Sequence, residues 1–291
     1  MVGLDLTDHD DHLIGYTHYL AQSFIPEEII FCHIKRRTEI PDRFRKQEDH
    51  SREEILKKIE DKVYSIFKDT ANVRCEVHEG TPHFDIWRET YLHHTDLFIA
   101  GEKEIEYGRK IVPEKFIRKS FCSVLLVPID ASEIKSIWVP VDFSDNSKDA
   151  LEVAIQAQSA NHAANIICHN VFETPSLSLI DKDLRQEYVD YYKNDARDKM
   201  KEFLTSIPNS KGIKGRFTPW TEVDVANHIK EDAEKSKADI IIMSSGGKSR
   251  ISTLLLGSTT AELVKLEKKI PLLILKQKIN KVRAWDILTN L

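Results

Sequence analysis

The segment Met243–Thr260 contains the residues whose types and spacing point most directly to ligand chemistry. It follows an apolar run, contains the glycine pair Gly246–Gly247, and includes Gly257–Ser258 at the start of a helix-like segment. Glycine lets the backbone come close to a ligand, and the free amides and dipole of a helix that begins at Gly257 favour an anion. A strand, a glycine-bearing loop and a helix start, in this order, predict a phosphate-binding site.

An internal repeat supports this interpretation, because glycine after a strand often marks only a turn. Val2–Asp8 and Val139–Asp145 share the pattern V-x-x-D-x-[S/T]-D at a separation of 137 residues. Cys32–His33 and Cys168–His169 repeat at 136 residues, and the last apolar run of each copy repeats at 148 residues. One ancestral unit is therefore present twice. The separation grows across the glycine segment, so the first copy has a shorter loop there and we do not expect the two halves to be functionally equivalent.

Composition excludes several classes of protein. The chain has 291 residues, of which 41% are hydrophobic and 31% charged, as in a soluble globular protein long enough for two domains. The formal net charge of −5 gives no electrostatic reason to expect a nucleic acid or an anionic membrane as a partner. No apolar stretch approaches the roughly 20 residues that span a bilayer, and the sequence begins with a strand-like segment rather than a signal peptide. We therefore expect a cytoplasmic protein whose four scattered cysteines are reduced thiols.

Short β-branched runs alternate with amphipathic segments in both copies, and this alternation predicts parallel sheets covered by helices. The strands expected in the first copy are residues 2–6, 28–34, 73–78, 95–100 and 123–128. Those expected in the second copy are residues 136–142, 165–170, 214–218, 238–243 and 272–275, with helices at 147–160, 183–207, 222–236 and 258–268.

The same pattern predicts the domain organisation. We expect one domain at residues 1–130 and another at residues 135–278, joined by a short linker and followed by a tail at residues 279–291. A linker this short predicts that the two domains pair within one chain, as a fused dimer does. The pairing covers a sheet edge, so we expect a monomer, and a homodimer of tandem chains stays open.

Four segments together resemble the universal stress protein family. They are Val139–Ser144, Ile167–His169, Ala238–Met243, and Gly247 with Gly257–Ser258 ten residues later. The resemblance covers both copies and is stronger in the second. It implies an α/β fold of two tandem doubly wound domains, Rossmann-like and similar to the adenine nucleotide alpha hydrolases, each with a five-stranded, mostly parallel sheet and flanking helices. It also implies a stress-response module that binds ATP in the second domain, with Mg²⁺ accompanying the nucleotide.

The nucleotide motif of the family, G-x2-G-x9-G-[S/T], aligns with Ser244, Gly247, Gly257 and Ser258. Carried over residue by residue, the resemblance implies that Asp142 accepts hydrogen bonds from the nucleoside. The full set of implied cofactor-binding residues is Pro140, Asp142, Val171, Met243, Ser244, Gly246, Gly247, Gly257, Ser258, Thr259 and Thr260. Ser244 departs from the motif, and if a positive φ is needed at this position, serine costs roughly 1 kcal/mol or more.

The first copy departs further from the motif. Gly101–Gly108 leads toward the next helix without a Gly-Ser pair, and Glu102, Glu104 and Glu106 place negative charge near a phosphate. This copy retains Asp5, but we expect it to lack a triphosphate site. We interpret it as a structural or regulatory partner of the second domain.

Simpler interpretations stand beside these predictions. Asp142 is also suited to cap the helix that follows it. His9, His12 and the aspartates around them have metal-binding chemistry, but such clusters on one short loop are more often accidental, so no metal ligand is predicted. No spacing indicates a catalytic residue, and we expect at most slow ATP hydrolysis.

Two alternative functions stay open. If Ser244 closes the site, the chain is a nucleotide-free scaffold or a module for another small ligand. The third possibility is an enzyme, such as a slow ATPase or a nucleotidyl transferase, which a steady-state turnover assay would detect.

Overall fold

The computed structural model describes residues 1–37, 51–68, 72–102, 104–105, 109–110, 114–160, 165–175, 180–220, 223–246, 256–266 and 269–276. These residues form two compact units, one up to Ile129 and the other from Asp130. The predicted tail, residues 279–291, lies outside the described residues.

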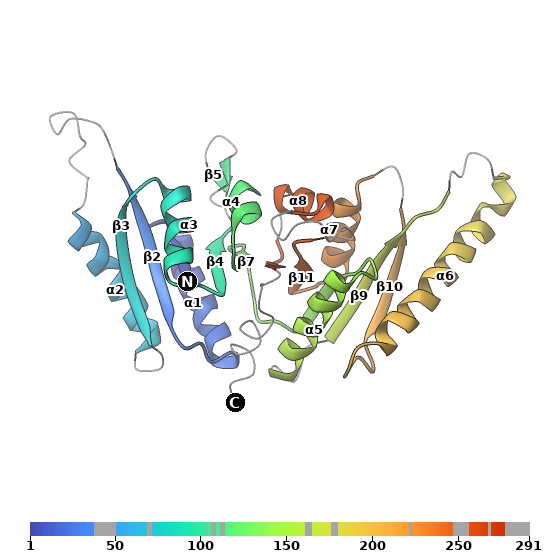
Figure 1. Ribbon diagram of the computed structural model, residues 1–291, viewed down its shortest axis with the longest axis horizontal. Coiled ribbons are helices and arrows are strands. Elements are labelled where there is room, and N and C mark those ends of the chain that lie inside the picture. Colours follow the sequence, from blue (N-terminus) through green and yellow to red (C-terminus); the bar gives the residue numbers. More distant parts are fainter. Residues whose placement is uncertain are drawn as a thin grey trace. The chain divides into compact units, whose positions relative to one another are not determined.

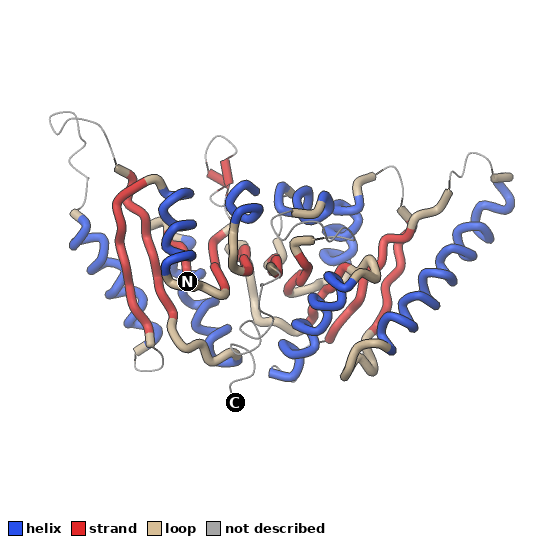
Figure 2. Tube along the Cα trace, in the orientation of Figure 1, coloured by secondary structure: helices blue, strands red, loops and turns tan. Residues whose placement is uncertain are grey.

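The first unit alternates strands and helices along the chain (Figures 1 and 2). Its main elements are β1 (Val2–Leu4), α1 (His9–Ser23), β2 (Ile29–Arg36), α2 (Arg52–Phe67), β3 (Val73–Gly80), α3 (Pro82–Leu92), β4 (Leu97–Gly101), α4 (Glu114–Lys119) and β7 (Ser123–Val127). The strands pair in the order β3-β2-β1-β4-β7, and every pairing is parallel. A short antiparallel pair, β5 (Glu104–Ile105) and β6 (Arg109–Lys110), follows β4 and was not expected from the sequence.

The second unit repeats this architecture. Its elements are β8 (Ser136–Pro140), α5 (Asp145–Ala160), β9 (Asn165–Phe172), η3 (Lys182–Leu184), α6 (Arg185–Thr205), β10 (Lys214–Pro219), α7 (Val225–Lys235), β11 (Ile240–Ser244), α8 (Ser258–Lys265) and β12 (Leu272–Leu275). The strand order is β10-β9-β8-β11-β12, again all parallel. The predicted fold class, two doubly wound α/β units with five parallel strands each, is confirmed.

The strands are apolar because helices cover both faces of each sheet (Figure 1). Every residue of β11 is buried, and Trp138 in the neighbouring strand β8 has no exposed surface. The helices pack in pairs, α1 against α2 and α7 against α8. Continuous apolar runs in the central strands thus follow from a parallel sheet with two covered faces.

The strand order reverses beside the first strand of each copy. In the second unit, β8 pairs with β9 on one side and with β11 on the other. Helices that leave the two sides of such a point go to opposite faces, and this opens a crevice at the carboxyl ends of the strands. The residues after β8 and β11 therefore occupy the position where an open α/β sheet binds ligands.

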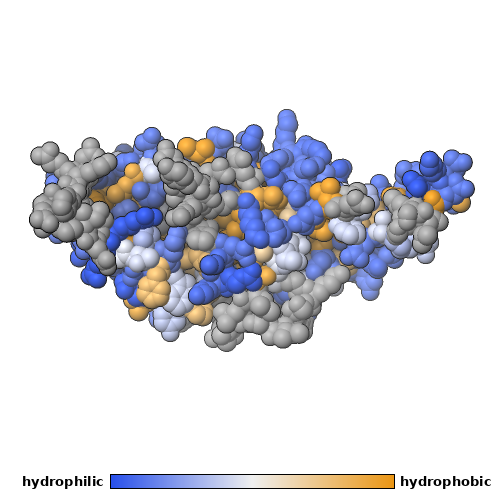
Figure 3. Space-filling view, turned by 90° about the horizontal axis from the view of Figure 1, so that it is seen from above, coloured by the Kyte–Doolittle hydropathy of each residue, from blue (hydrophilic) through white to orange (hydrophobic). Residues whose placement is uncertain are grey.

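The visible surface is mostly polar. On the face in Figure 3, the described residues are largely hydrophilic, with hydrophobic residues in small groups. Within the described parts of the chain, no helix has the length and apolar content needed to cross a membrane.

Candidate functional site

Asp142 lies directly after β8 and organises the turn into α5. Its Oδ1 atom accepts hydrogen bonds from the Ser144 amide at 3.1 Å, the Ser144 hydroxyl, and the Ser147 hydroxyl at 3.0 Å. Phe143 has a φ of 64°, so the turn places a non-glycine residue in the left-handed region. All three bonds end on Oδ1, and the structure gives Oδ2 no hydrogen bond to the described residues. Asp142 therefore forms the turn through Oδ1 and does not cap α5, because the Ser144 hydroxyl takes that role by accepting from the Ser147 amide at 3.3 Å.

The end of β11 lies next to this turn, because β11 pairs with β8. Ser244 is the last residue of β11, is buried, and pairs in register with Leu275 of β12. It is absent from the residues with positive φ, so its backbone is that of an ordinary strand. The strain that a positive φ would cause at this serine does not arise.

Gly246 follows one residue after Ser245 and comes close to the start of α5. A Cβ atom on Gly246 would lie 2.9 Å from Nδ2 of Asn146. A side chain at this position would therefore require the Asn146 amide to shift, whatever ligand is present. Asn146 and Ser147 belong to this corner and were not among the predicted site residues; the spacing Asp142-x-Ser144-x-x-Ser147 was the available signal.

The first turn of α8 is tied to the end of β11 by two hydrogen bonds. The Gly257 amide donates to the Ser245 carbonyl at 2.7 Å, and the Thr260 hydroxyl donates to the Ser244 carbonyl at 3.1 Å. Gly257 is the N-cap residue and has no side chain to cap the helix. The amides of Ser258 and Thr259 are therefore not taken by a side-chain cap, and the positive end of the helix dipole lies at the same edge as Asp142.

The remaining predicted residues lie on the strands, in the first turn of α8, or outside the described residues. Pro140 and Val171 are half-buried at the carboxyl ends of β8 and β9, and Met243 is buried inside β11. Ser258 is exposed, and Thr259 is half-buried. Gly247 lies outside the described residues. The strand pairing and the two hydrogen bonds from α8 bring the described members of the set to one edge of the sheet.

The first unit forms the same turn, but two aspartate side chains lie in it. Asp5 Oδ1 accepts from the amide and hydroxyl of Thr7 at 3.1 and 2.6 Å, and Leu6 has a φ of 63°. Asp10, at the position of Ser147, accepts from the amides of Asp5 and Leu6 at 3.1 and 2.8 Å. Burial, with the nearby Asp5 charge, raises the pKa of Asp10 to about 7 despite these bonds. Two carboxyl groups at this corner disfavour a phosphate.

His9 is a further difference between this corner of the first unit and that of the second. It is buried at the start of α1, and its ring lies 3.2 Å from the position a Cβ of Gly101 would take. The His9 ring therefore packs against the end of β4. At the matching position of the second unit, Asn146 packs against Gly246. Of the predicted acidic residues, Glu102 is half-buried, whereas the side chain of Glu104 and all of Glu106 lie outside what the structure describes.

The two matched strand histidines have structural partners. His33 Nδ1 lies 2.9 Å from the Leu4 carbonyl oxygen, and His169 Nε2 lies 3.0 Å from the Thr218 hydroxyl and 3.3 Å from Asp232. Burial lowers the pKa of His169 to about 4, although the Asp232 carboxylate opposes this shift. His169 is therefore neutral at physiological pH.

Comparison with known proteins agrees with this architecture. The model of the universal stress protein family matches residues 133–276. The chain belongs to the universal stress protein family. A universal stress protein of Methanocaldococcus jannaschii is 29% identical over 143 residues, which are 49% of this chain and 82% of the relative.

Solved structures extend the likeness of fold to both halves. A universal stress protein from Archaeoglobus fulgidus has a TM-score of 0.64 at 18% identity, with 96% of each chain covered. A putative universal stress protein from Pseudomonas aeruginosa has a TM-score of 0.59 at 12% identity, with 99% of this chain and 92% of the other covered. At these identities the likeness concerns the fold alone, and it includes the first unit, which the family model does not match.

Proposed function

We propose that the second unit of this universal stress protein binds ATP together with Mg²⁺ and that the chain acts as a regulatory module in a stress response. The observation that supports this most is the position of α8. Its N-terminus has no side-chain cap and is held against the end of β11 by Gly257 and Thr260. Helix N-termini at the carboxyl edge of a parallel sheet are suited to phosphate groups.

Each residue has a role that follows from its place. Asp142 Oδ2 accepts a hydrogen bond from a nucleoside hydroxyl, while Oδ1 stays in the turn. The amides of Ser258 and Thr259 donate to phosphate oxygens. Thr260 acts indirectly, because its hydroxyl already donates to the Ser244 carbonyl.

The lining of the base pocket comes from the strands. Pro140 and Val171 contact the base from the half-buried ends of β8 and β9. Mg²⁺ offsets the charge of the phosphates, which are its preferred ligands in nucleotide sites.

The proposal is regulatory rather than catalytic because the described residues of the proposed set include no evident general base. Hydrolysis needs a group that positions and deprotonates water. Asp142, the carboxylate of the proposed set, is committed through Oδ1 to the turn. Binding with at most slow turnover is the expected behaviour.

In this proposal the first unit does not bind the nucleotide. Asp5 and Asp10 place two carboxyl groups at the corner that in the second unit has Asp142 and a serine hydroxyl. We infer that MgATP binds once per chain.

Ser258→Glu tests the proposal without loss of the helix. Ser258 is exposed in the first turn of α8, where a carboxylate interacts favourably with the helix dipole but repels phosphate. Calorimetric titration of MgATP should show binding to the wild-type chain and a loss of at least about 100-fold in the variant.

Gln186→Glu is the matched control. Gln186 is exposed in the first turn of α6 in the same unit, so this substitution adds the same charge at a different helix start. It should keep wild-type affinity. Absence of MgATP binding by the folded wild-type chain would instead favour the nucleotide-free scaffold.

A further inference from the structure

A cluster of histidine and glutamate side chains lies between β3 and α3 of the first unit, away from the nucleotide edge. Glu76 Oε2 and Glu89 Oε2 lie 3.3 and 3.7 Å from His93 Nε2. All three ligand atoms lie within 4.8 Å of one another. His78 Nε2 is a further neighbour, 3.0 Å from Glu76 Oε2 and 3.9 Å from Glu89 Oε2. Glu76, Glu89 and His93 thus form a compact group of three ligand atoms, and His78 lies beside the two carboxylates but outside that group.

The carboxylates are held in this orientation by arginines on their other oxygens. Arg74 Nε lies 3.1 Å from Glu76 Oε1, and Arg88 Nη2 lies 2.8 Å from Glu89 Oε1. The Oε2 atoms are thus left to face the histidines. The Glu89 side chain is only 5% exposed, so its orientation is fixed in a buried setting. Outer partners that orient ligating carboxylates in this way are typical of metal sites.

The charge of the surroundings matches a divalent cation. Arg74 is paired with Glu28 at 3.3 Å, and Arg88 is paired with Asp85 at 2.8 Å. These outer acids neutralise the two arginines. Glu76 and Glu89 then contribute two negative charges on adjacent side chains, and burial makes such a pair costly without a cation.

We propose that Glu76, Glu89 and His93, completed by His78, bind one Zn²⁺ or a similar divalent transition-metal ion. Zinc takes four ligands tetrahedrally at about 2.0–2.2 Å, which places neighbouring ligand atoms roughly 3.3 Å apart. The nitrogen–oxygen separations of 3.0 to 3.9 Å are close to this value, whereas His78 lies outside the compact group and has to move toward His93 to become the fourth ligand. A mixed nitrogen and oxygen set favours zinc and its neighbours over Mg²⁺ or Ca²⁺, which prefer oxygen alone.

Metal binding requires a change of tautomer at His93. An Arg74 guanidinium nitrogen lies 3.2 Å from His93 Nδ1 and can only donate, so Nδ1 accepts and the neutral ring has its proton on Nε2. A metal bound at Nε2 requires the proton to be on Nδ1, because its release to solvent would leave an imidazolate, and the Arg74 nitrogen then has to turn away from Nδ1. Arg74 then keeps its second partner, Glu28. Affinity should therefore fall as pH decreases and the imidazoles become protonated.

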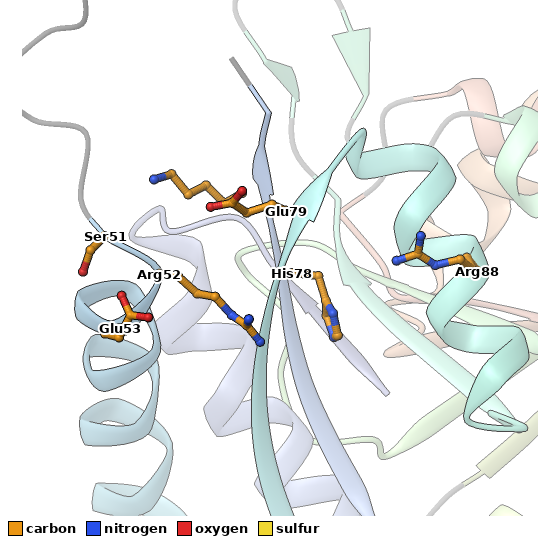
Figure 4. A pocket seen from close by; sticks show the side chains of 7 residues that line it. Ser51, Arg52, Glu53, His78, Glu79 and Arg88 are labelled. Atoms are coloured by element: carbon orange, nitrogen blue, oxygen red, sulfur yellow. The ribbon is translucent and has the colours of Figure 1, made fainter. Parts of the chain in front are cut away.

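A pocket open to solvent reaches the cluster at His78. It has a volume of about 540 Å³, and both His78 and Arg88 are among the residues that line it. Figure 4 shows His78 between β3 and α3, with the Arg88 guanidinium extending from α3 toward the same space.

A bound ion would fasten the outer strand of the sheet to its covering helix. Among the described strands, β3 pairs only with β2 and so forms an edge of the first sheet. Glu76 and His78 belong to β3, whereas Glu89 and His93 lie on α3 and at its C-cap. The site is structural in character, because the proposed set leaves no coordination position for a substrate.

The test is zinc titration of the tag-free, full-length chain after EDTA treatment, without nucleotide. We expect about one equivalent of bound zinc, with affinity at least about 100-fold weaker in Glu76→Gln and His93→Gln. His94→Asn is the matched control, because His94 is exposed and adjacent, and asparagine tolerates its φ of 48°. It should bind as the wild type does.

Three results would overturn the proposal. They are no zinc bound by the folded wild-type chain, unchanged binding in both ligand variants, or equal loss in His94→Asn. Circular dichroism verifies the fold of each variant. If a ligand variant is unfolded, the visible spectrum of Co²⁺ in the wild-type chain decides: four-coordinate bands support the site, and an octahedral spectrum refutes it.

Discussion

Asp142→Asn separates the turn-forming role of Asp142 from its proposed role in binding. The amide oxygen of asparagine can replace Oδ1 as acceptor for Ser144 and Ser147, while an NH₂ group replaces Oδ2. Hydrogen bonds to a neutral acceptor are weaker than those to a carboxylate, and three bonds in a half-buried turn give an expected destabilisation of about 1–2 kcal/mol. The fold should therefore survive.

Binding should respond more strongly than folding. A donor in place of the ligand-facing acceptor leaves a nucleoside hydroxyl without its partner, which costs about 1.4–3 kcal/mol, or roughly 10- to 150-fold in affinity. Urea denaturation measures the first effect and calorimetric titration of MgATP the second. The sequence repeat supplies the control, because Asp5→Asn changes the same turn in the first unit, where Asp5 accepts from Thr7.

The outcome for the pair of variants is specific. Asp5→Asn should leave MgATP affinity unchanged, and it should cost less stability than Asp142→Asn because the Asp5 charge opposes ionisation of Asp10. If folded Asp142→Asn binds MgATP within twofold of the wild type, Asp142 only forms the turn and the reasoning is wrong.

Two further predictions concern stability. Thr260→Val should lower the free energy of unfolding by about 1–2 kcal/mol, because it removes the hydroxyl that donates to the buried Ser244 carbonyl. Thr260→Ser keeps this hydrogen bond and is the control. Equal urea midpoints for the two variants would contradict the prediction. His169 has a pKa of about 4 in the fold against 6.5 as its ordinary value, so the unfolded chain binds more protons between these values and stability is lost as pH falls through this window. From pH 7 to pH 5 the loss due to His169 should be about 2 kcal/mol, and the stability difference between wild type and His169→Gln should shrink by that amount; parallel curves would refute the assignment.

The sequence predicts the framework well because parallel strands buried on both faces leave an unmistakable apolar pattern. Residues 165–170 and 214–218, for example, are found as β9 at 165–172 and β10 at 214–219. The short pair β5 and β6 was missed because two-residue strands in a charged segment have no apolar period.

The site was only partly accessible to sequence reasoning. Asp142, Ser244 and Gly257 could be placed at one edge because they lie at or after the carboxyl ends of parallel strands. The different roles of the two oxygens of Asp142 could not be predicted, because they depend on the turn at Phe143. The role of Gly246 against Asn146 likewise requires the packed structure.

The cluster at β3 and α3 was missed for a similar reason. Its members come from two elements, and only their packing brings Glu76 next to His93. A signal existed in the spacing of Glu89 and His93, four residues apart on one helix face, and of Glu76 and His78, two apart on one strand face.

The central claim, one nucleotide site in the second unit, is tested most directly by a crystal structure of the full chain with MgATP. The account predicts a single nucleotide per chain, with phosphate oxygens within hydrogen-bond distance of the Ser258 and Thr259 amides and a nucleoside hydroxyl on Asp142 Oδ2. A nucleotide at the Asp5 corner of the first unit, or none at α8 at saturating MgATP, would contradict it.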